Sequence, residues 1–126
     1  MTTLNKILYA EDEADIREIA TLALEVIGEL ETITCESGAT VIDLAIKFQP
    51  QVILLDVMMP DMDGPTTLKA LKENPQLSHL PVIFLTAKIL PDEINRFKSL
   101  GAVDVISKPF DPMTLADQIK EIWANL

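Results

Sequence analysis

Side chains that can take part in ionic or phosphoryl chemistry stand at the ends of four short apolar segments of this sequence. Glu11 and Asp12 follow the first segment, Asp56 ends the second, Thr86 ends the third and Lys108 follows the fourth. Carboxylates that come close together repel one another unless a cation joins them. Mg²⁺ suits such a set, because it keeps several waters and needs only a few protein oxygens. If the fold gathers these residues, the sequence predicts a magnesium site with a lysine and a hydroxyl beside it.

A carboxylate beside Mg²⁺ and a lysine can attack a phosphoryl group and form an aspartyl phosphate. Asp56 is the candidate nucleophile, while Lys108 and the metal would neutralise charge on the phosphoryl oxygens and the Thr86 hydroxyl would donate a hydrogen bond to them. Taken singly, these residues are more often an acidic first helical turn, a turn aspartate, a strand-end threonine and a solvated lysine. Their joint position at the ends of four segments favours the chemical interpretation.

The segment that would position Asp56 is a continuous run of Val, Ile and Leu at 52–55. Such a run is typical of a strand that is buried on both faces, as in a parallel sheet. Asp56 would then stand at the carboxyl end of the strand, and in open α/β sheets that edge is where ligands bind.

Apolar runs and helical patterns alternate along the whole chain. Alternation at this spacing predicts an α/β fold, a doubly wound five-stranded parallel sheet with five helices and right-handed crossovers. Gly28 would end the first helix, Asp111 would cap the last, and the Thr-rich strand would lie at the sheet edge. The expected strands are 6–10, 31–35, 52–56, 81–86 and 103–107, and the expected helices are 14–28, 37–48, 64–74, 91–100 and 111–123.

Composition limits the classes of protein that the chain can belong to. The 126 residues are enough for one domain with its own core, and the formal net charge of −10 argues against binding to nucleic acid or to anionic membranes. A single cysteine, Cys35, excludes an internal disulfide framework. We find no signal peptide pattern and no apolar run long enough to span a membrane, so we expect a cytoplasmic protein.

Other kinds of site do not fit the sequence. The acidic residues around Gly64 lack the ligand spacing of a calcium loop, the loop after the first strand is acidic where a nucleotide fold needs glycines, and no G-x-S-x-G elbow occurs. Cys35 and His79 have no partner for metal binding or nucleophilic work, and we expect His79 in an exposed loop.

The sequence resembles the receiver domain of two-component response regulators, of the chemotaxis-regulator type, over essentially the whole chain. This resemblance implies a flavodoxin-like sheet in the order 2-1-3-4-5, and a single receiver domain over residues 1–126 with no output domain. The motifs that carry it lie at 7–13, 52–64, 84–87, 101–102 and 108–110.

The resemblance also implies a role for each site residue. Asp56 would be the phosphoacceptor and would also help to hold Mg²⁺. The other ligands would be Asp12 directly, Glu11 through a water, and the backbone carbonyl of Met58. Mn²⁺ could substitute for Mg²⁺.

Thr86 and Ala87 would follow the phosphoryl group and Lys108 would pair with it. The bond between Lys108 and Pro109 would be the rare cis peptide that proline permits.

Three positions depart from the common pattern of the family. Glu11 replaces the first of two aspartates. Val105 stands where the family has a switch aromatic, and a small β-branched side chain cannot swing a ring between two positions. Met58 and Lys88 fall at the positions that tune hydrolysis of the phosphoaspartate, and the bulky Met58 should hinder an in-line water.

By this resemblance the chain is a signalling domain and not an enzyme, since it would catalyse only its own phosphorylation and dephosphorylation. The phosphodonor would be the phosphohistidine of a histidine kinase or a histidine phosphotransfer protein. A downstream protein would bind the face made by the fourth helix, fifth strand and fifth helix, which would also suit a weak homodimer.

Three alternatives stay open from the sequence. One is a degenerate receiver that acts as a phosphorylation-independent binding module, and Val105 is its main support. Another is a phosphatase of the haloacid dehalogenase type, although Met58 stands where that class has a second acid. The third is that the chain is the receiver piece of a larger regulator or hybrid kinase.

Overall fold

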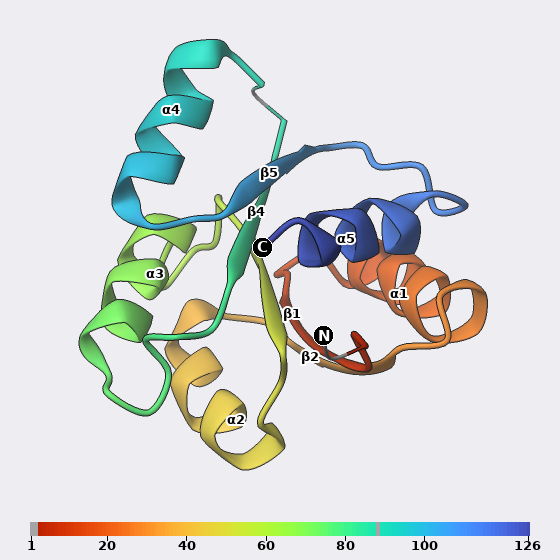
Figure 1. Cartoon of the computed structure of the whole chain (residues 1–126), viewed down its shortest axis with the longest axis horizontal. Helices are drawn as coiled ribbons and strands as arrows, with labels where there is room; N and C mark the ends of the chain where they lie inside the picture. Colours follow the sequence, from red (N-terminus) through yellow and green to blue (C-terminus); the bar gives the residue numbers. More distant parts are fainter. Residues whose placement is uncertain (1–2, 88) are drawn as a thin grey trace.

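The five predicted strands form one parallel sheet in the order β2-β1-β3-β4-β5 (Figure 1). This computed structural model describes residues 3–87 and 89–126. The α/β fold, the strand order and the edge position of the second strand agree with the prediction. The strands are β1 (Lys6–Ala10), β2 (Glu31–Cys35), β3 (Val52–Asp56), β4 (Val82–Thr86) and β5 (Asp104–Ser107).

Helices cover both faces of this sheet. Figure 1 shows α1 and α5 on one side, with α2, α3 and α4 on the other. The α-helices are α1 (Ala14–Leu22), α2 (Val41–Phe48), α3 (Gly64–Glu73), α4 (Pro91–Leu100) and α5 (Leu115–Ala124), with a short 3₁₀ turn, η2 (Gly38–Thr40), before α2.

Successive strand residues supply two separate cores because strand side chains alternate between faces. On β1, Ile7 and Tyr9 pack toward α1 and α5, whereas Leu8 and Ala10 pack toward the other three helices. β3 is buried at all five of its positions. Both faces of the central strands are therefore apolar, which is why their sequences read as continuous runs.

The first helix differs from the uniform α-helix predicted over 14–28. Its last turn, η1 (Ala23–Ile27), is a π-helix in which the Gly28 N–H bonds to the Ala23 carbonyl. Gly28 lies so close to α5 that an added Cβ would come within 2.5 Å of the Ala116 Cβ. Packing against α5 thus sets this end of the helix, and the sequence pattern of one helix does not contain that information.

The predicted cap of the last helix is wrong. Thr114 is the N-cap of α5, and Asp111 stands three residues earlier. Its side chain accepts from the N–H of Met113 at 2.9 Å, so Asp111 closes the turn that leads into the helix.

The parallel arrangement brings the carboxyl ends of all five strands to one edge of the sheet. The chain runs from β1 outward to β2 and then returns to β3 on the other side of β1. The ends of β1 and β3 therefore lie side by side at the point where the winding reverses, which is the usual ligand site of such sheets. Within the described residues, no helix combines the length and apolar character that crossing a bilayer requires.

Two leucines of the first helical segment provide a test of this packing. Leu24 is fully buried and Leu22 is 57% exposed. We expect Leu24→Ala to lower the free energy of unfolding by about 2–5 kcal/mol, because it leaves a cavity in the α1–α5 core. The matched Leu22→Ala should change it by less than about 0.5 kcal/mol. Urea unfolding measures both, and equal losses would contradict the helix orientation.

Candidate functional site

Three carboxylates meet where β1 and β3 end. Oxygens of Glu11, Asp12 and Asp56 lie within 4.8 Å of one another. Glu11 and Asp56 are buried, whereas Asp12 is exposed. The sheet thus brings together three acids that are up to 45 residues apart in the sequence, as its parallel topology predicts.

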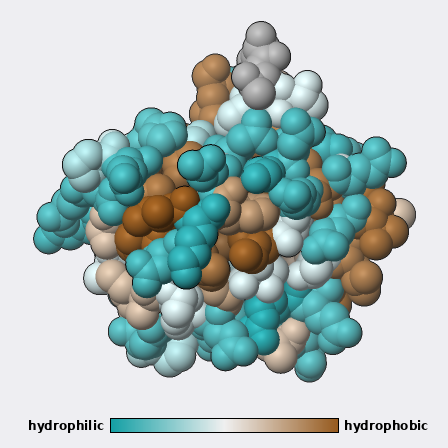
Figure 2. All heavy atoms as spheres, turned by 90° about the horizontal axis from the view of Figure 1, so that it is seen from below, coloured by the Kyte–Doolittle hydropathy of each residue, from teal (hydrophilic) through white to brown (hydrophobic). Residues whose placement is uncertain are grey.

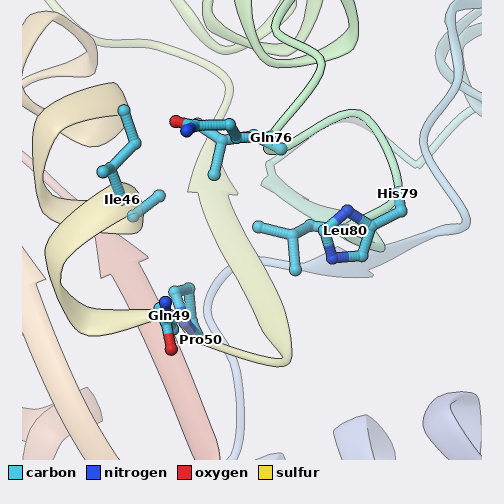
Figure 3. A pocket seen from close by; sticks show the side chains of 8 residues that line it. Ile46, Gln49, Pro50, Gln76, His79 and Leu80 are labelled. Carbon is cyan, nitrogen blue, oxygen red and sulfur yellow. The ribbon is translucent and has the colours of Figure 1, made fainter.

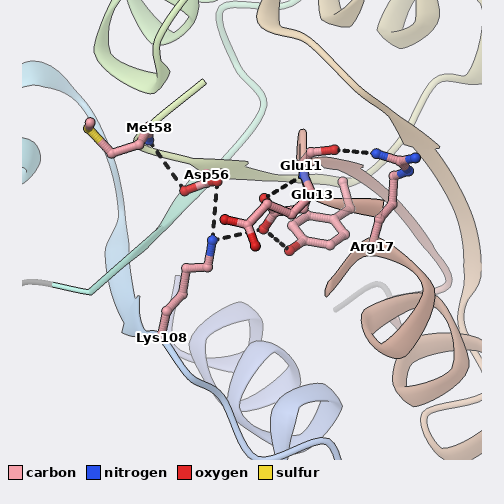
Figure 4. Close-up of polar contacts among 7 residues, drawn as sticks. Glu11, Glu13, Arg17, Asp56, Met58 and Lys108 are labelled. Carbon is pink, nitrogen blue, oxygen red and sulfur yellow. Dashed lines mark hydrogen bonds and ion pairs between the residues drawn. The ribbon is translucent and has the colours of Figure 1, made fainter. Parts of the chain in front are cut away.

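Lys108 joins two of these carboxylates. Its Nζ lies 2.9 Å from Glu11 Oε1 and 3.2 Å from Asp56 Oδ2 (Figure 4). The lysine follows β5, so the contact closes the site from a third strand end. A single ammonium therefore balances part of the charge of two buried acids.

The Glu11 carboxylate has further donors. The Tyr9 hydroxyl donates to Oε1 at 2.8 Å, and the Glu13 N–H donates to Oε2 at a longer 3.3 Å. Arg17 on α1 donates to the Glu11 backbone carbonyl at 2.8 Å and pairs with Glu36 at 3.5 Å. Both the side chain and the backbone of Glu11 are thus held in place.

The loop after β3 fixes the surroundings of Asp56. The Met58 N–H donates to Asp56 Oδ1 at 3.3 Å, and Asp63 caps α3 by accepting from the Thr66 N–H at 2.8 Å. Gly64 passes so close that an added Cβ would lie 2.9 Å from the Asp56 carbonyl oxygen. This approach explains the glycine at that point.

A hollow of about 530 Å³ opens above the carboxylates. It is large enough for a metal with its waters and a phosphoryl group. The residues that line it are Asp12, Glu13, Ile16, Asp56, Met58, Met59, Pro60, Thr86, Ala87 and Lys108.

Burial and neighbouring charge make Asp56 an unusually weak acid. Loss of solvent and the nearby Glu11 raise the pKa of Asp56 from 3.8 to about 7. Burial also opposes ionisation of Glu11, but hydrogen bonds from Asp56, Lys108 and Tyr9 outweigh it and lower the pKa of Glu11. Burial likewise disfavours the charged Lys108, yet its contact with Glu11 and the charge of Asp56 raise its pKa.

These residues fit a hard divalent cation. The donors are carboxylate oxygens, they repel one another, and the exposed Asp12 leaves one side of the cluster open to solvent. Asp12, Asp56 and Glu11 are the side chains that would hold Mg²⁺ here. The metal-ligand role of the Met58 carbonyl stays a prediction.

The structure places most of the predicted site residues together. Asp12, Asp56, Met58, Thr86, Ala87 and Lys108 share the hollow, and Glu11 lies beneath it against Lys108. The bond between Lys108 and Pro109 is cis, the conformation predicted for it. Lys88 lies outside the described residues.

Val105 lies away from this hollow. It is half-buried on β5, packs against the core under α2, α3 and α4, and lines a separate groove of about 490 Å³ between β5 and α5. Ile89 and Ile122 contribute apolar side chains to the same groove.

The sequence interpretation missed Tyr9 and Arg17. Tyr9 is the only tyrosine of the chain and stands two residues before Glu11, so period-two alternation could have placed the two on one face. Arg17 is one turn into α1, and nothing in the sequence marks its contact with the Glu11 carbonyl.

Another cavity, of about 500 Å³, lies at the opposite edge of the sheet, where Pro50 precedes β3 and Leu80 precedes β4 (Figure 3). Gln49, Gln76 and the exposed His79 also line it. Figure 2 shows the molecule from below, with apolar side chains in small groups between hydrophilic ones. Among the described residues, those that line this cavity are all different from those that line the carboxylate site.

Comparison with known proteins identifies relatives of this chain. A sequence model described as the response regulator receiver domain matches residues 7–120. The chemotaxis response regulator CheY4 of Vibrio cholerae superposes with a TM-score of 0.86 at 31% identity, covering 95% of this chain and 99% of that one.

Curated relatives are longer than this chain. A probable transcriptional regulator, ycf27, of Guillardia theta is 35% identical over 97% of this chain and 46% of its own length. The response regulator PleD of Caulobacter vibrioides is 37% identical over 93% of this chain and 26% of its own length. The chain thus spans less than half the length of these relatives.

The raised pKa of Asp56 predicts a pH-dependent effect of Asp56→Asn in metal-free buffer. Below about pH 4 Asp56 is protonated in both the folded and unfolded states. Between pH 4 and 7 only the folded state keeps the proton, so the wild-type protein loses stability as the pH rises. The variant has no such proton. Its free energy of unfolding should exceed that of the wild type by about 1–3 kcal/mol at pH 8, with a smaller difference at pH 5.

Urea unfolding in EDTA at both pH values measures this difference. Asp63→Asn removes a charge from the same loop but keeps a good helix cap, so it should show no pH-dependent gain. If Asp56→Asn is less stable than the wild type at pH 8, the crowding of carboxylates in the folded protein is not unfavourable and the prediction is wrong.

Proposed function

Because the chain belongs to the family of response regulator receiver domains, we propose that Asp56 accepts a phosphoryl group from a phosphohistidine and thereby switches a protein-binding surface. Members of this family act in phosphorylation-dependent signalling of two-component systems. The phosphodonor would be a histidine kinase or a histidine phosphotransfer protein.

The observation that carries the proposal is the contact of Lys108 with both Glu11 and Asp56 beneath an open hollow. A lysine that only stabilised the fold would not need a solvent-accessible carboxylate cluster beside it. The nucleophile, the charge-balancing ammonium and the Thr86 hydroxyl line the same hollow as Asp12. Their convergence supports phosphoryl transfer over the plainer interpretation of each residue.

Receiver domains bind Mg²⁺ through acidic residues, and this chain offers Glu11, Asp12 and Asp56 for it. When bound, the metal supplies positive charge that offsets charge on the phosphoryl oxygens and relieves repulsion among the carboxylates. Asp56 needs its ionised form to attack, and positive charge beside it favours that form. Mn²⁺ should substitute, since it accepts the same oxygen ligands.

Each residue then has a distinct task in the transfer. A carboxylate oxygen of Asp56 forms a bond to phosphorus as the bond from phosphorus to the donor histidine nitrogen breaks, and the imidazole leaves. Lys108 stays within reach of the incoming oxygens and balances their charge. Thr86, at the end of β4, donates its hydroxyl to a phosphoryl oxygen and so moves the β4–α4 loop.

That movement is the proposed output. A phosphoryl group can shift a two-state equilibrium only by its differential interaction with the two states. Val105 is too small for a ring-swinging switch, so shifts of loops and of α4 would have to change the face made by α4, β5 and α5. The exposed Ile89 and Leu90, and the groove beside Val105, favour a downstream protein partner or a weak homodimer at this face.

Curated relatives of this chain are longer than the chain itself. In this proposal the chain acts as a single receiver domain, and any output beyond protein binding would come from partners or from further segments of the kind that make its relatives longer.

Phosphorylation of Asp56 can be tested directly. We expect Mg²⁺ with acetyl phosphate to add one phosphoryl group to the wild-type protein and none to Asp56→Ala, as measured by intact mass. Asp63→Ala on the same loop is the control and should be labelled normally. Labelling that persists in Asp56→Ala would contradict the assignment. A folded wild-type protein that takes up no phosphoryl group would instead be a phosphorylation-independent binding module.

Met58 is predicted to lengthen the life of the phosphoryl group. It is 77% exposed and lines the hollow above Asp56, where its apolar side chain would hinder an in-line water. We expect Met58→Asn to accelerate dephosphorylation by about tenfold, equivalent to 1.4 kcal/mol of barrier. Met58→Leu retains the apolar bulk and should leave the rate nearly unchanged. The time course of phosphoryl loss after removal of the donor measures both rates, and equal rates for all three proteins would exclude this role.

A further inference from the structure

The fully buried tyrosine beneath the carboxylate cluster is not explained by packing alone. Tyr9 has no exposed surface and belongs to the core under α1 and α5. A phenylalanine would fill the same space without placing a hydroxyl in an apolar core. Burial of a hydroxyl is tolerated only when it finds a partner, and here that partner is Glu11.

Tyr9 and Lys108 donate to the same oxygen of Glu11. The Tyr9 hydroxyl lies 2.8 Å and the Lys108 ammonium 2.9 Å from Oε1. The other oxygen, Oε2, has a longer contact of 3.3 Å with the Glu13 N–H. The two donors therefore occupy Oε1 and leave Oε2 with the greater capacity to accept a water of a bound metal.

The two donors differ in whether they would stay on Glu11 once Asp56 is phosphorylated. Lys108 also contacts Asp56 at 3.2 Å, so a phosphoryl group on Asp56 would compete with Glu11 for the ammonium. Tyr9 cannot follow, because its ring is enclosed in the core and its strand is hydrogen-bonded on both sides by β2 and β3. Its hydroxyl is the donor that stays when the lysine turns away.

We propose that Tyr9 is a positioning residue that holds the Glu11 carboxylate in its metal-binding orientation while Lys108 is drawn to the phosphoryl group. This inference rests on the proposed function. A glutamate has one more rotatable bond than an aspartate, so it needs such an anchor more than an aspartate would. Outer contacts of this kind typically change metal affinity 10- to 100-fold when they are removed.

The first test is the Mg²⁺ affinity of Tyr9→Phe, measured by isothermal titration calorimetry. We expect the dissociation constant to rise about tenfold, while the retained ring preserves the far-UV circular dichroism spectrum and cooperative unfolding. Thr67→Val is the matched control, since it removes another fully buried hydroxyl, one that donates to the Asp63 carbonyl at 2.8 Å. That control should lower stability and leave Mg²⁺ affinity within twofold of the wild type.

The second test asks whether Tyr9 acts through Glu11. Glu11→Asp keeps a carboxylate but shortens the side chain by one methylene, which withdraws it from the Tyr9 hydroxyl. In the Glu11→Asp background we expect Tyr9→Phe to change Mg²⁺ affinity less than twofold and to raise the melting temperature of the metal-free protein, because it removes an orphaned hydroxyl. In the wild-type background Tyr9→Phe should lower the melting temperature.

A spectroscopic readout is available because Tyr9 is the only tyrosine in the chain. With tyrosine labelled with ¹³C at Cζ, a single resonance reports the hydrogen bond to Glu11. We expect this resonance to shift during a Mg²⁺ titration of the wild type and to saturate with the calorimetric affinity. A resonance that does not move would overturn the inference.

The outcomes separate this inference from the proposed function. Equal Mg²⁺ affinity of wild type and Tyr9→Phe, or an equal loss in both Glu11 backgrounds, would show a merely structural tyrosine and overturn the inference alone. A wild-type protein that neither binds Mg²⁺ nor accepts a phosphoryl group would overturn the proposed function and, with it, this inference.

Discussion

The interaction on which the site depends is the sharing of one ammonium between two buried carboxylates. Lys108 lies within 3.2 Å of both Glu11 and Asp56, and these three residues come from the ends of β5, β1 and β3. A buried carboxylate without a partner is strongly disfavoured, so each acid requires the lysine to be in reach. The sheet must therefore hold three strand ends in fixed register, and the two apolar layers on its faces do so.

Even with the lysine, the cluster is incompletely balanced. Three carboxylate oxygens lie within 4.8 Å, and the pKa of Asp56 is raised to about 7 by burial and by Glu11. The folded protein stores this unfavourable crowding at the one edge where solvent and ligands can enter. Such local instability at a site is commonly offset by a well-packed remainder, here two cores that bury the whole of β3 and β4.

The carboxylate site and the proposed binding face are separate parts of this fold. The carboxylates and Lys108 lie at the hollow above the sheet edge, while Val105 lines a groove between β5 and α5. Of the residues that the structure describes, none lines both the hollow and the groove. If phosphorylation switches this protein as proposed, Val105 offers no ring that could move. The segment after β4 and α4 would then have to carry the signal, because close-packed cores do not deform continuously.

The sequence by itself determined the strands, their parallel arrangement and the edge at which the acids and the lysine gather, since apolar periodicity and connection rules act locally or through general topology. The strand order followed only from the resemblance to receiver domains. Glu11, Asp12, Asp56, Thr86 and Lys108 could be named because each directly follows or ends an apolar run. Tertiary structure alone decided which oxygen meets which donor, the π turn before Gly28, the displacement of the α5 cap from Asp111 to Thr114, and the contacts of Tyr9 and Arg17 with Glu11. These features depend on how segments far apart in the chain are positioned, to within a few tenths of an ångström. Such precise positions arise only when the two helical layers pack onto the sheet.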